Sequence, residues 1–441
     1  MSRVRVAEVG TNLVEDIARV FEPFGGGKRV LQGREEVFVK INAVESKPHC
    51  YTPPDFVEAL VRYLIREGAR RVYVMDNCTQ GNFTRLVFHA TGITRAAQRA
   101  GAQVVFLDEG PEESLSLPPI DTAESGAIPY DQKEIALPRF IVEKLIRNRS
   151  SVAYINVPKF KTHCMTTVTL GIKNQWGLVA QKDRIADHNH LLPRKLVDIL
   201  ELLQPDFTLI DAREATQHGH YPSQRLLDRI LVPYGLIIGG DDVVSVDAVG
   251  CHLMGFAWRD VEHIQLAHAR GVGMADLDQI EVIGDLTRHR KSLSWELLPI
   301  FPVDVDVHKG EELCCKEGCA SNVMACLQVF SLDFQGRGGF SIVMGKGWDP
   351  RRLDGLQERV LVVGKCAVNE VGERLRSTRA PDSLAFSNGC NNLTETITCL
   401  TKWMEISPLR MLPVHPLRSS LLLLQARLRG SSAAIPPLWI R

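Results

Sequence analysis

Short apolar segments alternate with longer amphipathic ones over most of the first two thirds of the chain. Val37–Asn42 has the β-branched character of a buried strand, and Pro53–Gly68 carries apolar residues near helical spacing. Proline is tolerated at the start of such a helix, and glycine is common just after its end. The alternation predicts repeated strand–helix–strand units. We therefore expect an α/β fold with a mostly parallel sheet and helices on both faces.

The same pattern continues to residue 283, with an acidic, proline-containing interruption at residues 108–132. The further strands predicted are Val72–Met75, Val104–Leu107, Val152–Val157, Phe207–Ile210, Leu236–Ile238 and Ile280–Ile283. The further helices predicted are Thr84–Ala100, Lys195–Leu203, Val246–Met254 and Val261–Gly271. Ligands of such sheets bind beyond the carboxyl ends of the strands. The polar positions expected there are Asn42, Asp76, Pro158-Lys159, Asp211 and Gly239–Asp242.

Residues 286–400 differ from residues 1–285 in hydrophobic pattern and in composition. They show few clear helical patterns, include the glycine-rich segment Gln335–Gly339, and hold seven of the eleven cysteines. The sequence after Glu405 contains arginines but no acidic residue. We predict an α/β core domain over 1–285, a smaller cysteine-rich unit that binds a metal or cluster over 286–400, and a basic, poorly packed tail over 401–441.

The composition of the chain argues against several classes of binding partner and location. Lys plus Arg and Asp plus Glu each number 52, so the formal net charge is zero and no global field favours nucleic acid. No apolar stretch approaches the length of a membrane span, and the N-terminus lacks the apolar core of a secretory signal. Eleven cysteines in 441 residues are too few for a disulfide scaffold. We expect a cytoplasmic protein without a nucleic-acid partner or membrane span.

The densest group of chemically versatile residues lies within Asn156–Gly177. Neighbouring lysines lower one another's pKa, so that one can act as a base or nucleophile. The same cations could instead clamp a phosphate or carboxylate, and a solvated loop with incidental lysines is the simplest alternative. Lys159, Lys161 and His163 alternate, so they would share one face of an extended chain. We predict these three residues and Lys173 as catalytic residues.

Other histidine-containing segments give weaker signals. His188-x-His190 could bind a metal together with Asp183 or Asp187, but a surface loop explains it equally well. His49-Cys50 and His218-Gly-His220 follow predicted strands and are further candidates. The fingerprints of dinucleotide and P-loop sites are absent, so neither NAD nor a P-loop nucleotide is predicted.

Four cysteines lie within 13 residues of the C-terminal unit, namely Cys314, Cys315, Cys319 and Cys326. Thiolates at these positions could ligate an iron–sulfur cluster or zinc, with Cys366 or Cys390 completing the set. The spacing matches neither the ferredoxin pattern nor a standard zinc knuckle, and buried free cysteines are the alternative. We predict a metal centre at these four cysteines.

Three motifs in the first unit resemble one known family. They are Val37–Asn42, Asn156–His163 with Thr169–Asn174, and Ser245–Val249 with Met254-Gly255. Together they resemble the domain of unknown function 362, many of whose members are described as iron–sulfur centre proteins. The resemblance spans about residues 35–285 and implies an α/β core with a link to iron–sulfur chemistry. The family pattern points to Lys40, Asn42, Lys159, Lys161, His163, Lys173, Asn174 and Asp247. Many members append a ferredoxin-like module, which this chain lacks.

Three functions are compatible with these observations. The first is an iron–sulfur enzyme, redox or lyase-like, that acts on a small anionic substrate and exchanges electrons with a redox partner. Its substrate-binding residues would be Lys40, Asn42, Asp76, Asn174, Asp211 and Asp247. The second is a non-catalytic binding module for an anionic metabolite, with structural zinc. The third is an interaction scaffold that uses the basic tail.

Overall fold

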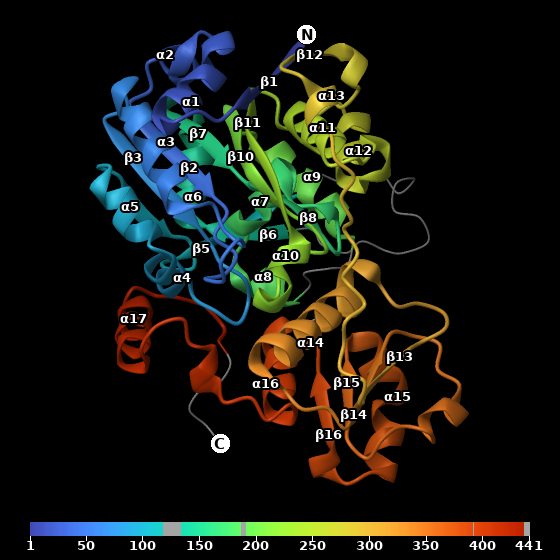
Figure 1. Ribbon diagram of the computed structural model, residues 1–441. Helices are drawn as coiled ribbons and strands as arrows, with labels where there is room; N and C mark the ends of the chain where they lie inside the picture. Colours follow the sequence, from blue (N-terminus) through green and yellow to red (C-terminus); the bar gives the residue numbers. More distant parts are fainter. Residues whose placement is uncertain (118–133, 187–190, 391, 436–441) are drawn as a thin grey trace.

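A mixed β-sheet lies at the centre of the larger unit in the computed structural model (Figure 1). The structure describes residues 1–117, 134–186, 191–390 and 392–435. The strand order is β12-β1-β11-β10-β7-β2-β3-β4, with β8 paired to β10 and β9 to β8. These strands are β1 (Ser2–Glu8), β2 (Glu36–Ile41), β3 (Arg71–Asp76), β4 (Gln103–Phe106), β7 (Val152–Val157), β8 (Lys159–His163), β9 (Thr167–Val168), β10 (Phe207–Thr216), β11 (Leu231–Gly240) and β12 (Ile280–Ile283).

Parallel pairing dominates this sheet, which confirms the fold class predicted from the sequence. β4, β3, β2, β7 and β10 form a continuous parallel series. β11 runs antiparallel to both β10 and β1. β1 was not among the predicted strands, although its alternation of buried Val4 and Val6 with less buried Arg3 and Arg5 is the period of a strand.

Helices cover both faces of the sheet because successive side chains of a strand point to opposite sides. In β2, Val37, Val39 and Ile41 share one core with residues of α1 (Leu13–Phe21), α3 (Pro54–Arg66) and α5 (Ile93–Arg99). Phe38 belongs to the core on the other face. That core includes residues of α7 (Leu170–Asn174), α9 (Leu192–Leu202), α11 (Val243–Leu253) and α12 (Glu262–Ala269).

The helix predicted over Thr84–Ala100 is two helices, α4 (Thr84–Thr91) and α5. Gly92 separates them and has a φ of 82°, a left-handed conformation that glycine adopts without steric cost. The turn places Ile93 and Ala97 in the core beside α3. The periodicity continues through the break, which explains why the pattern predicts one helix.

The C-terminal unit contains a second sheet, with four parallel strands in the order β13-β14-β15-β16. The prediction of few clear helices here was wrong, because helices cover both faces of this sheet as well. α14 and α16 pack on one face and α15 on the other. The elements are β13 (Val305–Lys309), α14 (Ser321–Phe334), β14 (Phe340–Met344), β15 (Val360–Val363), α15 (Lys365–Thr378), β16 (Leu384–Ser387) and α16 (Leu393–Trp403).

The predicted boundary at residue 400 falls inside α16. Trp403, Met404 and Ile406 are buried in the core of the C-terminal unit, so this unit extends beyond the predicted boundary. α17 (Pro416–Leu428) then crosses back to the larger unit and lies beside α4 (Figure 1). Its Leu422 and Ala426 pack against Phe83 and Leu86. The described part of the tail is therefore packed, contrary to the expectation of a loose extension.

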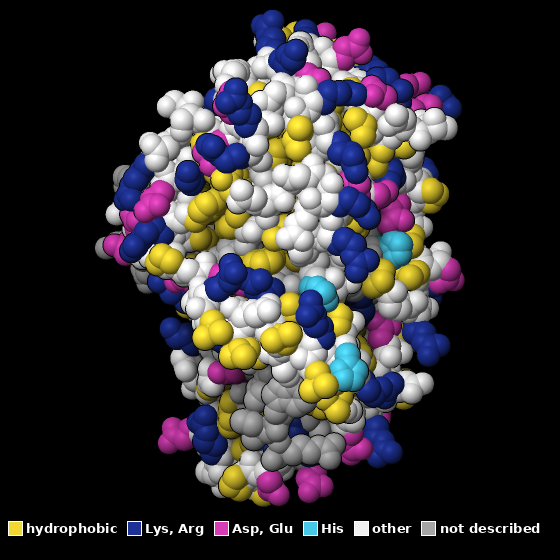
Figure 2. Space-filling view, turned by 90° about the vertical axis from the view of Figure 1, so that its left-hand side faces the viewer, with side chains coloured by type: hydrophobic (Ala, Val, Ile, Leu, Met, Phe, Trp, Pro, Cys, Tyr) yellow, Lys and Arg dark blue, Asp and Glu magenta, His cyan; other side chains and the backbone are white. Residues whose placement is uncertain are grey.

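The outer face of α17 remains apolar and exposed. Leu417, Leu421, Leu424 and Leu428 are all more than two fifths exposed. In the space-filling view of this side of the molecule, hydrophobic side chains gather at the height of α17 among scattered basic ones (Figure 2). None of the described helices is long and apolar enough to cross a membrane.

The packing of α17 can be tested with two leucines of the same helix. Leu422 is 4% exposed and Leu424 is 56% exposed. We expect Leu422→Ala to lower the free energy of unfolding by about 2 to 5 kcal/mol, because it leaves a cavity against α4. Leu424→Ala should change it by less than about 0.5 kcal/mol. Urea unfolding of both variants measures this, and equal effects would show that α17 is not docked as described.

Candidate functional site

A cavity of about 80 Å³ lies beyond the carboxyl ends of β2, β3 and β7. Its walls carry charged and amide side chains from four segments of the larger unit. Asn322 at the start of α14 and Leu393 at the start of α16 also line it, so the C-terminal unit contributes to its enclosure. The polar lining includes Lys40, Asn42, Asp76, Asn77, Gln80, Lys161, His163, Lys173, Asn174 and Arg184. The cavity thus occupies the position expected for a ligand site in this type of sheet.

One buried ion pair forms the floor of this cavity. Lys40 Nζ lies 2.6 Å from Asp76 Oδ1, and it also donates a hydrogen bond to the carbonyl of Ile41. Burial lowers the pKa of Lys40, and Asp76 acts against this shift. A Cβ atom on Gly177 would lie 2.6 Å from Asp76 Oδ1. Only glycine therefore allows the chain to pass so close to the pair.

Lys161 and Lys173 place further positive charge in the cavity. Lys161 donates hydrogen bonds to Asn42 Oδ1 and to the carbonyl of Cys50, both at 2.9 Å. Burial lowers the pKa of Lys161 to about 8. Burial also lowers the pKa of Lys173 to about 7, and the charges of Lys161 and Arg184 lower it further. Lys173 can therefore gain or lose a proton near neutral pH.

Arg184 is the fourth cation of the cavity and has no carboxylate partner among the described residues. It is 4% exposed, and its Nε and Nη2 atoms have no hydrogen-bond acceptor in the described part of the chain. Its own carbonyl accepts a hydrogen bond from Gln80 Nε2. Buried guanidinium groups are normally paired, because an unpaired buried charge is costly. This arrangement indicates that an anion belongs beside Arg184.

A chain of asparagine side chains fixes the position of α7, which carries Lys173. Asn42 donates to Asn174 at 2.9 Å, and Asn174 donates to Asn156 at 2.8 Å. Asn156 in turn donates to the carbonyl of Gly171. These bonds connect β2, β7 and α7, so the lysine and asparagine side chains are held in one geometry.

Asp247 lies outside the cavity and anchors the start of α7. Its carboxylate accepts hydrogen bonds from the backbone N–H groups of Gly171 at 2.6 Å and Ile172 at 2.8 Å. Burial raises its pKa to about 8, and these two hydrogen bonds oppose the rise. A residue predicted to bind substrate therefore acts through α7, whose Lys173 and Asn174 line the cavity.

Two other predicted site residues also lie outside the lining. Lys159 pairs with Glu214, with 3.3 Å between Nζ and Oε1. Asp211 accepts hydrogen bonds from Arg213, which also contacts Asp55. Lys159 still lies close enough to lower the pKa of Lys161. Both residues belong to a polar cluster next to the cavity, so the alternation of Lys159 with Lys161 did not place both lysines in it.

His163, Cys164 and His220 form a compact group at one end of the cavity. Their possible ligand atoms lie within 4.8 Å of one another, which is close enough for a metal ion. The two imidazole rings, however, are stacked with centroids 3.8 Å apart and an angle of 7° between their planes. A histidine holds a metal in the plane of its ring, so parallel stacked rings cannot direct their nitrogens to one ion. As arranged, this group shapes the cavity wall.

The cysteines of the C-terminal unit group differently from their order in the sequence. Cys319 approaches the loop after β15 so closely that a Cβ atom on Gly364 would lie 2.5 Å from its sulfur. Burial raises the pKa of the Cys319 thiol, and four nearby thiols add to the rise. The cysteine group consists of Cys319 with Cys390, Cys314, Cys315 and Cys366.

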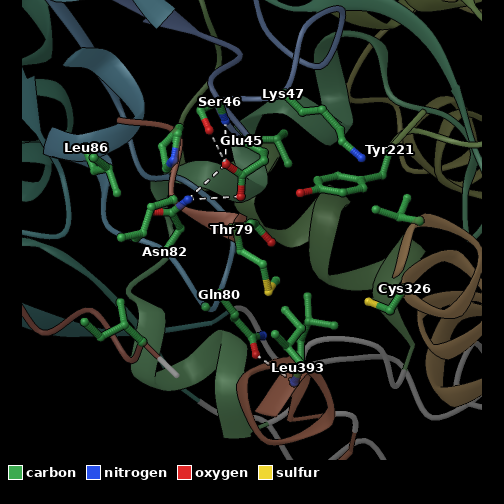
Figure 3. Close-up of a pocket in the computed structure, with 18 of the residues that line it drawn as sticks. Glu45, Ser46, Lys47, Thr79, Gln80, Asn82, Leu86, Tyr221, Cys326 and Leu393 are labelled. Atoms are coloured by element: carbon green, nitrogen blue, oxygen red, sulfur yellow. Dashed lines mark hydrogen bonds between the residues drawn. The ribbon is translucent and has the colours of Figure 1, made fainter. Parts of the chain in front are cut away.

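Cys326 is separate from this cysteine group. It lies within α14, whereas Cys319 precedes this helix, and it lines a second, larger cavity together with Tyr221 (Figure 3). Among the described residues, no three cysteine sulfurs lie within 4.8 Å of one another. Tetrahedral zinc with Zn–S bonds of about 2.3 Å needs sulfurs about 3.8 Å apart. The cysteine group is therefore not arranged for a single zinc ion.

Sequence reasoning missed Arg184 as a site residue. The surrounding segment drew attention for its histidines and aspartates, but Asp183 accepts a hydrogen bond from the backbone of Ala136 instead. His188-x-His190 and Asp187 lie outside the described residues. An arginine within ten residues of a lysine-rich motif was the available signal. Its burial, which gives it meaning, depends on the packing of α8 (Gln181–Ala186).

Comparison with known proteins supports the resemblance noted from the motifs. Residues 37–252 match the model of the family described as domain of unknown function 362 (DUF362). A thylakoid-associated protein of Synechocystis sp. is 23% identical over 247 residues, which are 54% of this chain and 68% of that protein. A Thermotoga maritima protein of known crystal structure is 11% identical in sequence, and the match covers 87% of this chain and 89% of that protein with a TM-score of 0.34.

The low pKa of Lys173 predicts a specific dependence of stability on pH. An unfolded lysine has a pKa near 10.5, so between about pH 7 and 10 the unfolded chain binds a proton that folded Lys173 does not. Folding is therefore favoured increasingly as pH rises through this range. Asp247 acts in the opposite direction below pH 8, so the informative quantity is the difference between variants.

We expect the unfolding midpoint of the wild type, relative to Lys173→Met, to rise between pH 7 and 9. The variant lacks the titrating group, whereas the exposed Lys28→Met serves as a matched control and should follow the wild type. Thermal unfolding at several pH values measures the difference. A Lys173→Met profile parallel to the wild type would show that Lys173 is not a buried titrating group.

Proposed function

We propose that this protein is an enzyme that binds a small anionic substrate in the cavity lined by Lys161, Lys173 and Arg184. The observation that carries the proposal is the excess of buried positive charge. Asp76 forms an ion pair with Lys40, and among the described residues no carboxylate forms an ion pair with any of the other three cations. An anion such as a carboxylate or phosphate group would supply the missing charge and accept hydrogen bonds from the free guanidinium nitrogens.

Two side chains of the cavity are suited to moving protons. Lys173, with a pKa of about 7, is poised to accept or donate a proton at neutral pH. His163 lies in the same lining and is the second candidate. A fixed anion with a proton-transferring group beside it is the arrangement of lyase-like enzymes that remove a proton next to a bound acid group. The reaction class rests on this combination.

Sulfate is a suitable probe because its charge is constant across the relevant pH range. We expect calorimetry to show sulfate binding that weakens as pH rises from 6.5 to 8.5, because Lys173 and then Lys161 lose their protons. Arg184→Met should weaken binding roughly 10- to 100-fold, the usual loss for a charged hydrogen bond. The exposed Arg418→Met is the matched control and should bind as the wild type does. Affinity independent of both pH and Arg184 would refute the proposal.

Catalysis is tested once a ligand is known. A metabolite panel screened by thermal shift identifies acids that stabilise the wild type, and each is then incubated with the protein to detect a product. Conversion that is lost in Lys173→Met even at ligand concentrations that saturate the variant supports an enzyme. Stabilisation without conversion favours the alternative, a non-catalytic binding module.

We also propose that the cysteine group binds an iron–sulfur cluster rather than the alternative, zinc. Several thiols at the carboxyl edge of the small sheet form a suitable donor set, and the sulfur spacing argues against a single tetrahedral ion. When bound, such a cluster supplies electron transfer and calls for a redox partner. The cavity that holds Lys161, Lys173 and Arg184 is called the cation cavity below. Cys319 lies three residues before Asn322, and Cys390 lies three residues before Leu393. Asn322 and Leu393 both line this cavity.

Cysteine variants separate the cysteine group from the set predicted by spacing. We expect protein purified without oxygen to absorb in the visible range and to contain iron, and Cys319→Ser and Cys366→Ser to lose it. Cys326→Ser should retain the iron, because Cys326 lines a different cavity. Iron lost only in Cys326→Ser, or zinc in place of iron, would contradict this assignment.

A cytoplasmic location is part of the same proposal. The structure shows no disulfide bond between the described cysteines, which suits a reducing compartment. A thylakoid association is stated for one relative and would be a second candidate location for this chain.

A further inference from the structure

A second cavity, of about 420 Å³, lies between the two units beside the cation cavity (Figure 3). This interunit cavity is within the size range of small-molecule sites. α14 contributes Ala325, Val329 and Phe330, and the tail contributes Met411 and Leu412. Further apolar walls come from the larger unit. The interunit cavity thus exists only because the C-terminal unit and the tail fold against the first domain.

Two of the charged side chains that line the interunit cavity, Glu45 and Lys47, already have partners, and a third, Arg410, is exposed to solvent. Glu45 accepts a hydrogen bond from the hydroxyl of Ser46, and Asn82 Nδ2 donates to both carboxylate oxygens of Glu45 (Figure 3). Lys47 forms an ion pair with Asp333 and lies over the ring of Tyr221. What remains for a ligand is mainly apolar surface, which favours a hydrocarbon or aromatic group.

The two cavities share part of their lining. The shared residues are Val44, Thr79, Gln80, His220, Asn322 and Leu393. Gln80 stands at this boundary, since its amide donates to the carbonyl of Arg184 and accepts a hydrogen bond from the backbone N–H of Leu393 at 3.2 Å. One molecule that passes Gln80 would reach Arg184 at one end and Val329 at the other.

We infer that the ligand is an amphiphilic organic acid, whose anionic head lies among the cations and whose apolar body fills the interunit cavity. The inference rests on the proposed anion site and adds the chemical class of the substrate. A small hydrophilic anion would occupy only the cation cavity and leave the apolar walls in contact with water. The charged head and the apolar body each find a complementary surface, and the two surfaces adjoin.

A series of straight-chain carboxylates tests this inference on the wild-type protein. Acetate, butanoate, hexanoate and octanoate carry the same head, so only the apolar body changes. Calorimetry at pH 6.5 keeps both the acids ionised and Lys173 largely protonated. We expect affinity to rise roughly three- to fourfold for each methylene group that is buried. Octanoate that binds no tighter than acetate, while sulfate still binds, would overturn the inference and leave the anion site standing.

A cavity-filling variant locates the apolar body. Val329→Phe should remove most of the gain from acetate to octanoate, because the added ring occupies the interunit cavity. Sulfate affinity reports separately whether the cation cavity is intact, and Ala325→Phe replaces Val329→Phe if the latter does not fold. Octanoate that binds Arg184→Met as tightly as the wild type would overturn a ligand shared by both cavities. Absence of sulfate binding in the wild type would instead refute the proposed function itself.

Discussion

The burial of four cationic side chains around one carboxylate is the constraint on which the rest of this structure depends. Each charge loses its hydration in the cavity, and Asp76 forms an ion pair only with Lys40. Lys173 meets the cost by a lowered pKa, whereas a guanidinium cannot lose its proton and must find an acceptor. Such an arrangement requires a rigid surrounding fold, and the proposed anionic ligand would complete it.

That rigidity comes from hydrogen bonds between the protein's own side chains and backbone. Asp247 holds the first turn of α7, and the chain from Asn42 through Asn174 to Asn156 connects this helix with two central strands. The polar side chains that the family motifs share are thus divided between two tasks. Some supply charge to the cavity, and others fix the backbone that carries those charges.

The C-terminal unit contributes to the site from outside the family domain. Asn322 and Leu393 border the cation cavity, and α14 forms a wall of the interunit cavity. α17 then returns to α4 and packs on Phe83 and Leu86, next to residues that line both cavities. The tail therefore forms part of the wall of the interunit cavity, although its composition suggested a dispensable extension. Two members of the cysteine group, Cys319 and Cys390, each precede one of the two bordering side chains by three residues.

Local patterns in the sequence predicted the α/β class, most of the strands in the larger unit and the family motifs. These features depend on the local period of hydrophobic residues and on short spacings between motif residues, and both can be recognised in a single sequence. The sequence also identified Lys40, Asn42, Lys161, His163, Lys173 and Asn174, all of which line the cavity. Three features became visible only in the folded structure. Lys159 pairs with Glu214, and Arg184 is buried without a carboxylate partner among the described residues. Cys366 and Cys390, rather than Cys326, lie near Cys319. The physical reason is that burial, partner choice and pKa depend on segments distant in sequence, whose approach no local pattern encodes.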